Sequence, residues 1–141
     1  MTTSPPILSG KTPVRIPLAM SSVGSQGSPV TTATDGIRFL HAFMNAELFS
    51  RASLDAMLTN WNRIFLPLRY GTGVMKFCLS PLMSLPGAPR EFLGHSGSSG
   101  AVLFWAPAAD LYICGTLNQM AKPSMPFRLL PRLAALASVP G

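Results

Sequence analysis

Two apolar runs near the C-terminal end, residues 101–105 and 111–117, constrain the fold of this chain more than any other feature. Short apolar runs bounded by turn signals are typical of buried strands. The segment between them contains Pro107 and Asp110, residues that favour a turn. We therefore expect a hairpin. Because both runs are apolar at successive positions, both faces of the sheet need cover from other elements.

Helical periodicity marks the segments that precede and follow this hairpin. Apolar residues recur at helical spacing over residues 34–47 and predict a helix there. Thr32 is its expected N-cap, in a capping box with Asp35 in place of Glu. Ser53 is expected to cap a second short helix, and Pro126 suits the first turn of a last helix.

The remaining segments complete the expected order of elements. Pro131 would interrupt the last helix, which therefore either kinks or begins near residue 131. Residues 70–78 are β-prone, and residues 92–95 predict another strand. Residues 1–33, rich in Pro, Ser, Thr and Gly, are expected to be an irregular lead-in to a domain over residues 34–141. This order is typical of an α/β (α+β) fold with an antiparallel sheet flanked by helices.

Composition and charge exclude several classes of function. The formal charge is +6, but the Lys and Arg residues are spaced singly along the sequence, so we expect no nucleic-acid partner. The longest apolar stretch, residues 101–115, is broken by Pro107 and Asp110 and is too short to span a bilayer. The first residues of the chain have neither the basic nor the apolar region of a signal peptide. The sequence does not indicate in which compartment the protein is found.

The charged fraction and the cysteines bear on how the chain is buried. Charged residues make up 11% of the sequence, against about 25% in typical soluble domains. That bias suits a chain that buries part of its surface against a partner or belongs to a larger core. Cys78 and Cys114 lie in apolar runs and are expected to be buried free thiols, with a disulfide left open. No cofactor or metal is expected.

The segment over residues 93–100, Leu-Gly-His-Ser-Gly-Ser-Ser-Gly, has three interpretations. The first is a Gly/Ser turn between strands, with His95 a satisfied sheet residue. The second is a nucleophile elbow of the G-x-S-x-G type. We reject it because Ser98 replaces the last Gly, a strand follows instead of a helix, and neither His41 nor His95 follows the serine.

The third interpretation is a resemblance to a family. His95-Ser96-Gly97 resembles the H-x-G form of the third active-site motif of β-lactamases and penicillin-binding proteins. Three further segments are similar to motifs of that family, in the same order along the chain. They are Ser28-Pro-Val-Thr-Thr-Ala-Thr-Asp35 with Arg38-Phe-Leu40, Tyr70-Gly-Thr-Gly73, and Gly115-Thr-Leu-Asn-Gln119.

The resemblance implies a fold, an activity and a set of site residues. The fold would be the C-terminal half of the β-lactamase/transpeptidase-like fold. The activity of an intact protein would be hydrolysis, through an acyl-enzyme, of a β-lactam, a D-Ala-D-Ala peptide or a small ester. His95, Ser96 and Gly97 would bind this small-molecule acyl substrate, and Ser98 would contribute an N–H to an oxyanion hole. Members of the family are often exported.

The sequence departs from the family in its catalytic motifs. No lysine follows a serine at the S-x-x-K spacing, and no Y-x-N motif is present. We therefore expect no catalytic residue in this chain and no activity of the chain alone. A truncated gene model, an internal start and a degenerate copy stay open. The alternative is a non-catalytic interaction module that binds a partner, or itself, through an exposed sheet edge.

Overall fold

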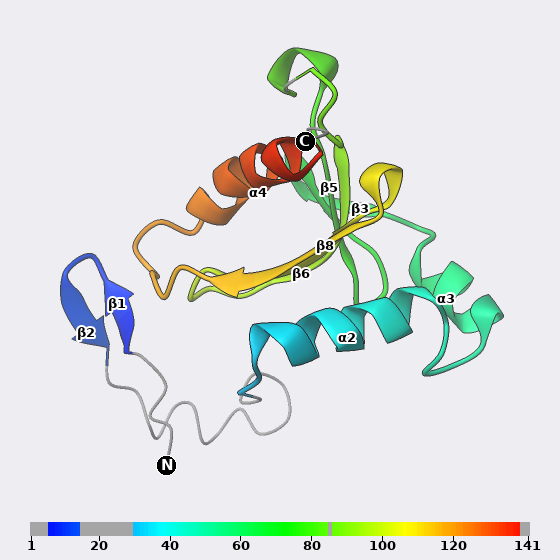
Figure 1. The fold of residues 1–141 in the computed structure, drawn as a ribbon, viewed down its shortest axis with the longest axis horizontal. Coiled ribbons are helices and arrows are strands. Elements are labelled where there is room, and N and C mark those ends of the chain that lie inside the picture. The colour runs from blue at the N-terminus through cyan, green and yellow to red at the C-terminus, as the bar shows by residue number, and fades with distance from the viewer. Residues whose placement is uncertain (1–5, 15–29, 85, 139–141) are drawn as a thin grey trace.

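The computed structural model describes residues 6–14, 30–84 and 86–138. Within these residues a six-stranded antiparallel sheet lies between two helices, α2 (Ala33–Met44) and α4 (Met125–Ala137), on opposite faces (Figure 1). The fold is therefore mixed α+β, as expected. In spatial and chain order the strands are β3 (Asn62–Phe65), β4 (Leu68–Tyr70), β5 (Met75–Cys78), β6 (Glu91–Ser96), β7 (Ala101–Ala106) and β8 (Leu111–Thr116).

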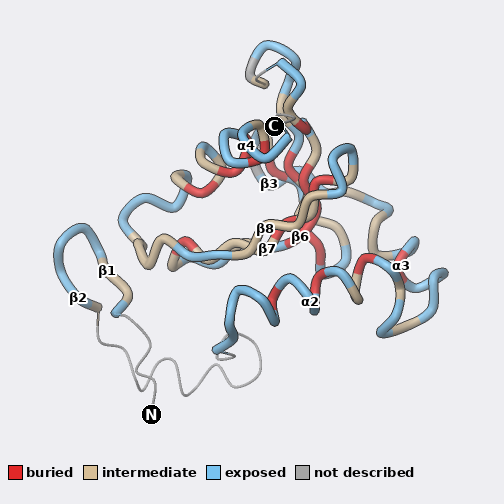
Figure 2. The backbone as a smooth tube through the Cα atoms, viewed as in Figure 1, coloured by how far each residue is buried: buried red, intermediate tan, exposed pale blue. Residues whose placement is uncertain are grey.

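The core under α4 contains a group of phenylalanines among aliphatic side chains. Phe77 and Phe92 are fully buried and stack with ring centroids 4.6 Å apart. Phe104 and Phe127 pack edge-on against Phe77, and Leu130 of α4 completes the cluster. Burial of each such side chain stabilises the fold by about 1.5–3 kcal/mol. This cluster holds the middle of the sheet, where the buried residues concentrate (Figure 2).

The opposite face is covered by α2, which packs on β7 and β8. Leu40 and Met44 of the helix meet Leu93 of β6 in a second cluster. A Cβ on Gly36 would lie 2.6 Å from Sγ of Cys114, so the glycine allows this close approach. The two faces of the sheet therefore have the cover that the apolar strands require, because α2 lies on one face and α4 on the other (Figure 1).

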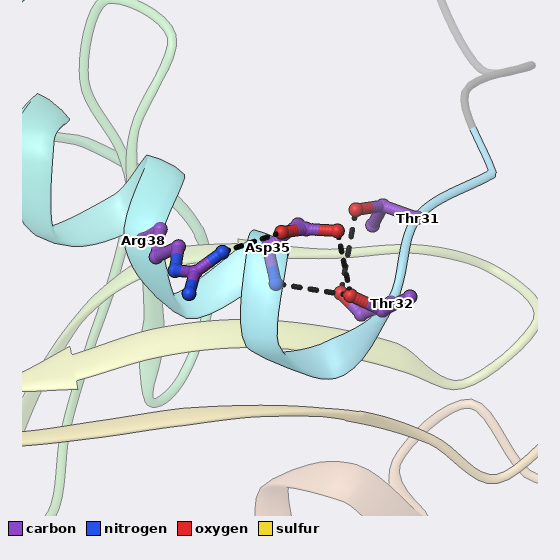
Figure 3. Close-up of polar contacts among 4 residues, drawn as sticks. All are labelled: Thr31, Thr32, Asp35 and Arg38. Carbon is purple, nitrogen blue, oxygen red and sulfur yellow. Dashed lines mark hydrogen bonds and ion pairs between the residues drawn. The ribbon is translucent and has the colours of Figure 1, made fainter.

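The N-terminal end of α2 is capped as expected (Figure 3). The Thr32 hydroxyl accepts a hydrogen bond from the Asp35 N–H at 3.1 Å and donates to Asp35 Oδ2 at 2.8 Å. Arg38 forms an ion pair with the same carboxylate. The cap of α3 (Arg51–Met57) corrects the prediction: Ser50, not Ser53, is its N-cap.

Residues 62–78 differ from the single strand expected over residues 70–78. They form three strands, and a turn between Tyr70 and Met75 separates β4 from β5. In that turn the Gly71 N–H donates to the Val74 carbonyl at 2.8 Å, and Gly73 has φ of 80°, which favours glycine. Strand β3 is short and was not predicted.

The connections and the last helix complete the domain. A 3₁₀ turn (Pro107–Ala109) joins β7 to β8, which confirms the predicted hairpin. Another 3₁₀ turn, Pro81–Met83, lies between β5 and β6. Helix α4 begins at Met125 and runs through Pro131, so of the two alternatives, a kinked helix or a start near residue 131, the later start is wrong. In the described part of the chain no helix combines the length and the hydrophobicity needed to cross a membrane.

One described segment of the predicted lead-in, residues 7–14, is not irregular, whereas residues 30–32 are irregular. Strands β1 (Ile7–Ser9) and β2 (Thr12–Val14) form a small hairpin. Leu8 joins it to the chain beyond β8, since its N–H donates to the Asn118 carbonyl at 2.7 Å. The Gln119 amide accepts from the Gly10 N–H at 2.8 Å and donates to the Gly10 carbonyl at 3.0 Å. The other residues predicted as lead-in, 1–5 and 15–29, lie outside the described residues.

The two thiols lie on separate strands and are both free. Strands β5 and β8 are separated by β6 and β7, so Cys78 and Cys114 are at least about 14 Å apart at ordinary strand spacing. A disulfide needs Cα atoms within about 7 Å. Cys78 and Cys114 therefore form no disulfide with each other. The prediction of buried thiols is wrong for Cys78, which is exposed.

Candidate functional site

The segment that carries the family-like motif lies at the end of β6 and in the turn to β7. The Gly97 N–H donates to the Ala101 carbonyl at 2.9 Å, and the Gly100 N–H donates to the Gly97 carbonyl at 3.0 Å. Gly100 has φ of 82°. This is a three-residue hairpin loop, a tight turn followed by a left-handed glycine. The predicted Gly/Ser turn between strands is confirmed.

Strand β6 extends beyond the end of its neighbour β5. Arg90 accepts a hydrogen bond from the Leu79 N–H at 2.8 Å, and in an antiparallel ladder alternate residues face the same neighbour. The ladder between β5 and β6 ends at the pair Met75–Gly94. The N–H and C=O of Ser96 therefore point past the end of β5, towards the turn that joins β4 and β5. That stretch of β6 is paired on the β7 side only.

Gly94 fixes how closely β6 and β7 approach beside the site. Its φ is 155°, and a Cβ at this position would lie 2.0 Å from the Leu103 carbonyl oxygen. Such a contact is far inside van der Waals distance, so only glycine fits. The residue before His95 thus holds the two backbones together and sets the position from which the His95 side chain extends.

His95 is exposed and has a defined partner. The Tyr70 hydroxyl lies 2.8 Å from His95 Nε2, and the two rings meet at 90° with centroids 5.8 Å apart. The tautomer decides which atom donates this hydrogen bond. Tyr70 comes from the end of β4, 25 residues before the histidine. An imidazole held by a phenol in this way can bind a polar group or transfer a proton.

Ser96 points away from His95. Its hydroxyl donates a hydrogen bond to Sδ of Met75 at 3.5 Å. Successive side chains of a strand lie on opposite faces, which separates the serine from the histidine. A nucleophilic serine needs a base within hydrogen-bond reach. The described contacts of Ser96 include no such base.

Gly97 and Ser98 are both exposed at the turn. A Cβ on Gly97 would meet Ala101 and Ser99 at ordinary contact distances, so an alanine would also fit at this position. Ser98 is the first central residue of the turn closed by Gly97 and Gly100. The hydrogen bond that closes the turn does not use its N–H.

Tyr70 is the site residue that sequence reasoning missed. It was noted as part of the segment Tyr70-Gly-Thr-Gly73, but not as a partner of His95. The contact depends on the register of three strands and the turn after β4, which no local motif specifies.

Among the described residues, no group of three or more His, Cys, Asp or Glu side chains could hold a metal ion.

A scan against protein-family models, a search of curated proteins and a search of solved structures each returned no match for this chain.

Proposed function

We propose that the end of β6 is the acyl-substrate-binding strand of a serine hydrolase of the β-lactamase and penicillin-binding-protein type. The observation that carries this proposal is the free side of β6 after Gly94. There the backbone groups of Ser96 point past the end of β5, next to the exposed His95. A substrate amide or ester could pair with those groups as an added strand would.

The proposed roles are those that the family resemblance implies for these residues. His95, held by Tyr70, would contact the polar end of the substrate. Gly97 would let the substrate approach the backbone closely. The N–H of Ser98 would face the developing oxyanion in the reaction. The partial β-lactamase/transpeptidase-like fold is part of this proposal, supported by the motif order and by an antiparallel sheet between helices.

The proposed reaction needs a nucleophile that these residues do not supply, because the sequence contains no S-x-x-K motif. Incubation with a fluorophosphonate, and separately with a penicillin, followed by intact-mass analysis checks this point. We expect no adduct from either reagent. A stoichiometric adduct on Ser96 would overturn the assignment of roles, since the serine would then be the nucleophile.

Binding tests the proposal independently of catalysis. Benzylpenicillin is titrated against the whole chain while heat is measured in a calorimeter. We expect saturable binding that His95→Ala weakens about tenfold, the loss of one hydrogen bond to a charged group. His41→Ala is the matched control, because His41 is also exposed but lies on α2. Equal affinities of the two variants would count against the proposal.

A second function, an interaction module, is favoured by the free edge at β8. The Leu117 N–H donates to the Gly100 carbonyl at 3.1 Å, which orients odd-numbered residues of β8 towards β7. The N–H and C=O groups of Tyr112, Cys114 and Thr116 therefore face outwards. Along Leu111–Thr116 the described residues provide no strand on that side.

The α4 side of this edge suits an added strand with an apolar face. An apolar cavity of about 170 Å³ lies between β8 and α4, and Leu133 beside it is 51% exposed. No charged residue or proline interrupts residues 111–117, although such residues commonly protect free edges. In this candidate function a second copy of the chain, or a partner strand, pairs with β8.

Size-exclusion chromatography tests the second candidate. We expect dimers or larger species that Thr116→Lys, which puts a charge on the edge, converts to monomers. Thr31→Lys is the matched control, because Thr31 is exposed away from the sheet. A concentration-independent monomer of the unmodified chain would contradict the interaction module.

A further inference from the structure

Three cationic residues that are distant in sequence form a row across three adjacent strands. Arg63 of β3 lies directly opposite Arg69 of β4, and Arg69 lies directly opposite Lys76 of β5. Directly opposite residues have Cβ atoms about 4.5–5.5 Å apart and project from the same face. The register of the sheet thus gathers charges that the sequence spaces singly.

The row lies on the α2 side of the sheet. Its neighbours along the strands, Leu68 and Phe77, belong to the cluster under α4, so alternation directs Arg69 and Lys76 to the other face. Lys76 Nζ lies 5.4 Å from the centroid of the Trp61 ring, which packs in the α2-side cluster. Arg63 and Arg69 are exposed.

Like charges directly opposite one another destabilise a sheet, and the acidic residues of this chain compensate the three cations only in part. The sequence contains five Asp and Glu residues, and only Glu91, an ion-pair partner of Lys76, contacts the row. The other four have partners elsewhere: Asp35 with Arg38, Glu47 with His41, Asp55 with Arg51, and Asp110 with Trp105. Three cations and one carboxylate leave a local charge of +2.

We propose that Arg63, Arg69 and Lys76 form a binding site for the phosphate group of a small phosphorylated compound. A phosphate monoester carries about −1.5 to −2 charges near neutral pH, which matches the uncompensated charge of the row. The planar guanidinium of an arginine presents paired donors that fit phosphate oxygens. Arg69 is the central member, since a cation lies opposite it on both sides.

Trp61 gives the site one apolar wall. Its ring packs beside Lys76 and also contacts the turn between β4 and β5, since a Cβ on Gly71 would lie 3.1 Å from the ring. An organic part attached to the phosphate can lie against this ring. The inference does not rest on the proposed hydrolase activity, because it uses none of the residues at the end of β6.

The test is a titration of the whole chain with inorganic phosphate, followed by amide and arginine side-chain NMR signals. We expect saturable shifts at Arg63, Arg69 and Lys76, and an affinity about tenfold lower in Arg69→Gln. Arg69→Lys keeps the charge but loses the guanidinium. Its phosphate affinity should therefore lie between that of the unmodified chain and that of Arg69→Gln. Arg128→Gln is the matched control, because Arg128 is an exposed arginine of α4.

Two parallel titrations separate a phosphate site from general ionic effects. Sodium chloride at the same ionic strength and sodium acetate at the same concentration should each give small, unsaturated shifts. Shifts of equal size and saturation with either salt would overturn the proposal. So would an unchanged phosphate affinity in Arg69→Gln, because the central cation would then have no part in binding.

Discussion

The Tyr70 hydroxyl lies 2.8 Å from Nε2 of His95, and the two rings meet edge to face. This contact joins the end of β4 to the end of β6 across the end of β5. It gives an exposed histidine a fixed orientation at the one stretch of β6 that β5 does not pair. The proposed substrate site is therefore built from a strand end, a turn and a tyrosine from another hairpin.

Replacement of Tyr70 by Phe should remove the hydrogen bond that orients the His95 ring. The variant keeps the ring but loses the hydroxyl, at a cost of about 1 kcal/mol in the free energy of unfolding. We expect the ¹⁵N signals of the His95 ring to change, because the tautomer loses its partner. Tyr112→Phe makes the same chemical change at the other tyrosine and should leave the His95 signals unchanged. Identical His95 signals in Tyr70→Phe would contradict the contact.

Replacement of Gly94 by Ala should destabilise the sheet strongly. The new Cβ would lie 2.0 Å from the Leu103 carbonyl oxygen, so β6 and β7 must separate. We expect a loss of about 3 kcal/mol or more in urea unfolding.

Gly115→Ala is the matched control for that measurement. A Cβ on Gly115 meets nothing within 4 Å, although this glycine also lies in a strand. Its effect should stay within about 0.5 kcal/mol. Similar stabilities of the two variants would show that the close approach at Gly94 is wrong.

Replacement of Gln119 by Ala should loosen the β1–β2 hairpin without unfolding the domain. The amide makes two hydrogen bonds to Gly10, each worth about 1 kcal/mol. We expect faster amide hydrogen exchange at Leu8 and Gly10 and unchanged exchange in β6. Gln119→Glu retains the acceptor but not the donor and should show a smaller effect. Unchanged exchange in both variants would contradict the role of Gln119.

The thiols give the chain a stability that falls at alkaline pH. Partial burial raises the pKa of Cys114. At Cys78, which is largely exposed, partial desolvation is the main cause of a raised pKa; the charge of Lys76 opposes this shift and that of Glu91 adds to it. The folded chain therefore retains these protons at a pH where the unfolded chain, with a thiol pKa of about 8.5, has lost them. Because the native state then binds more protons, the free energy of unfolding falls as pH rises above that value.

Urea unfolding between pH 7 and 10 measures this effect. The double variant Cys78→Ser, Cys114→Ser removes both thiols and should flatten the profile at its lower end. Burial also raises the pKa of Tyr112. The free energy of unfolding should therefore still fall with pH near pH 10 in both the unmodified chain and the double variant. A profile of the double variant identical to that of the unmodified chain would contradict the contribution of the thiols.

The elements that the sequence predicts well are those with a local signal. Residues 101–106 and 111–116 are strands because apolar runs meet at a turn, and α2 begins after Thr32 because a capping side chain precedes a periodic helix. The cap of α3 was placed one turn too late, since Ser50 and Ser53 are both capping residues and their hydroxyls bond to each other.

The features that local patterns could not predict depend on register. His95 contacts Tyr70 only because the turns after β3 and β4 align the strands. The same alignment places Arg69 opposite Arg63 and Lys76. The hairpin β1–β2 was missed for a related reason, since its strands are only three residues long and dock through Leu8.

The most direct test of the account is a map of benzylpenicillin binding by amide NMR shifts. The proposal predicts that saturating ligand shifts the amides of His95, Ser96, Gly97 and Ser98, with the signals of α4 unchanged. Shifts centred anywhere else, such as at the outer edge of β8, or no saturable shift at millimolar ligand, would contradict the assignment of β6 as an acyl-substrate-binding strand.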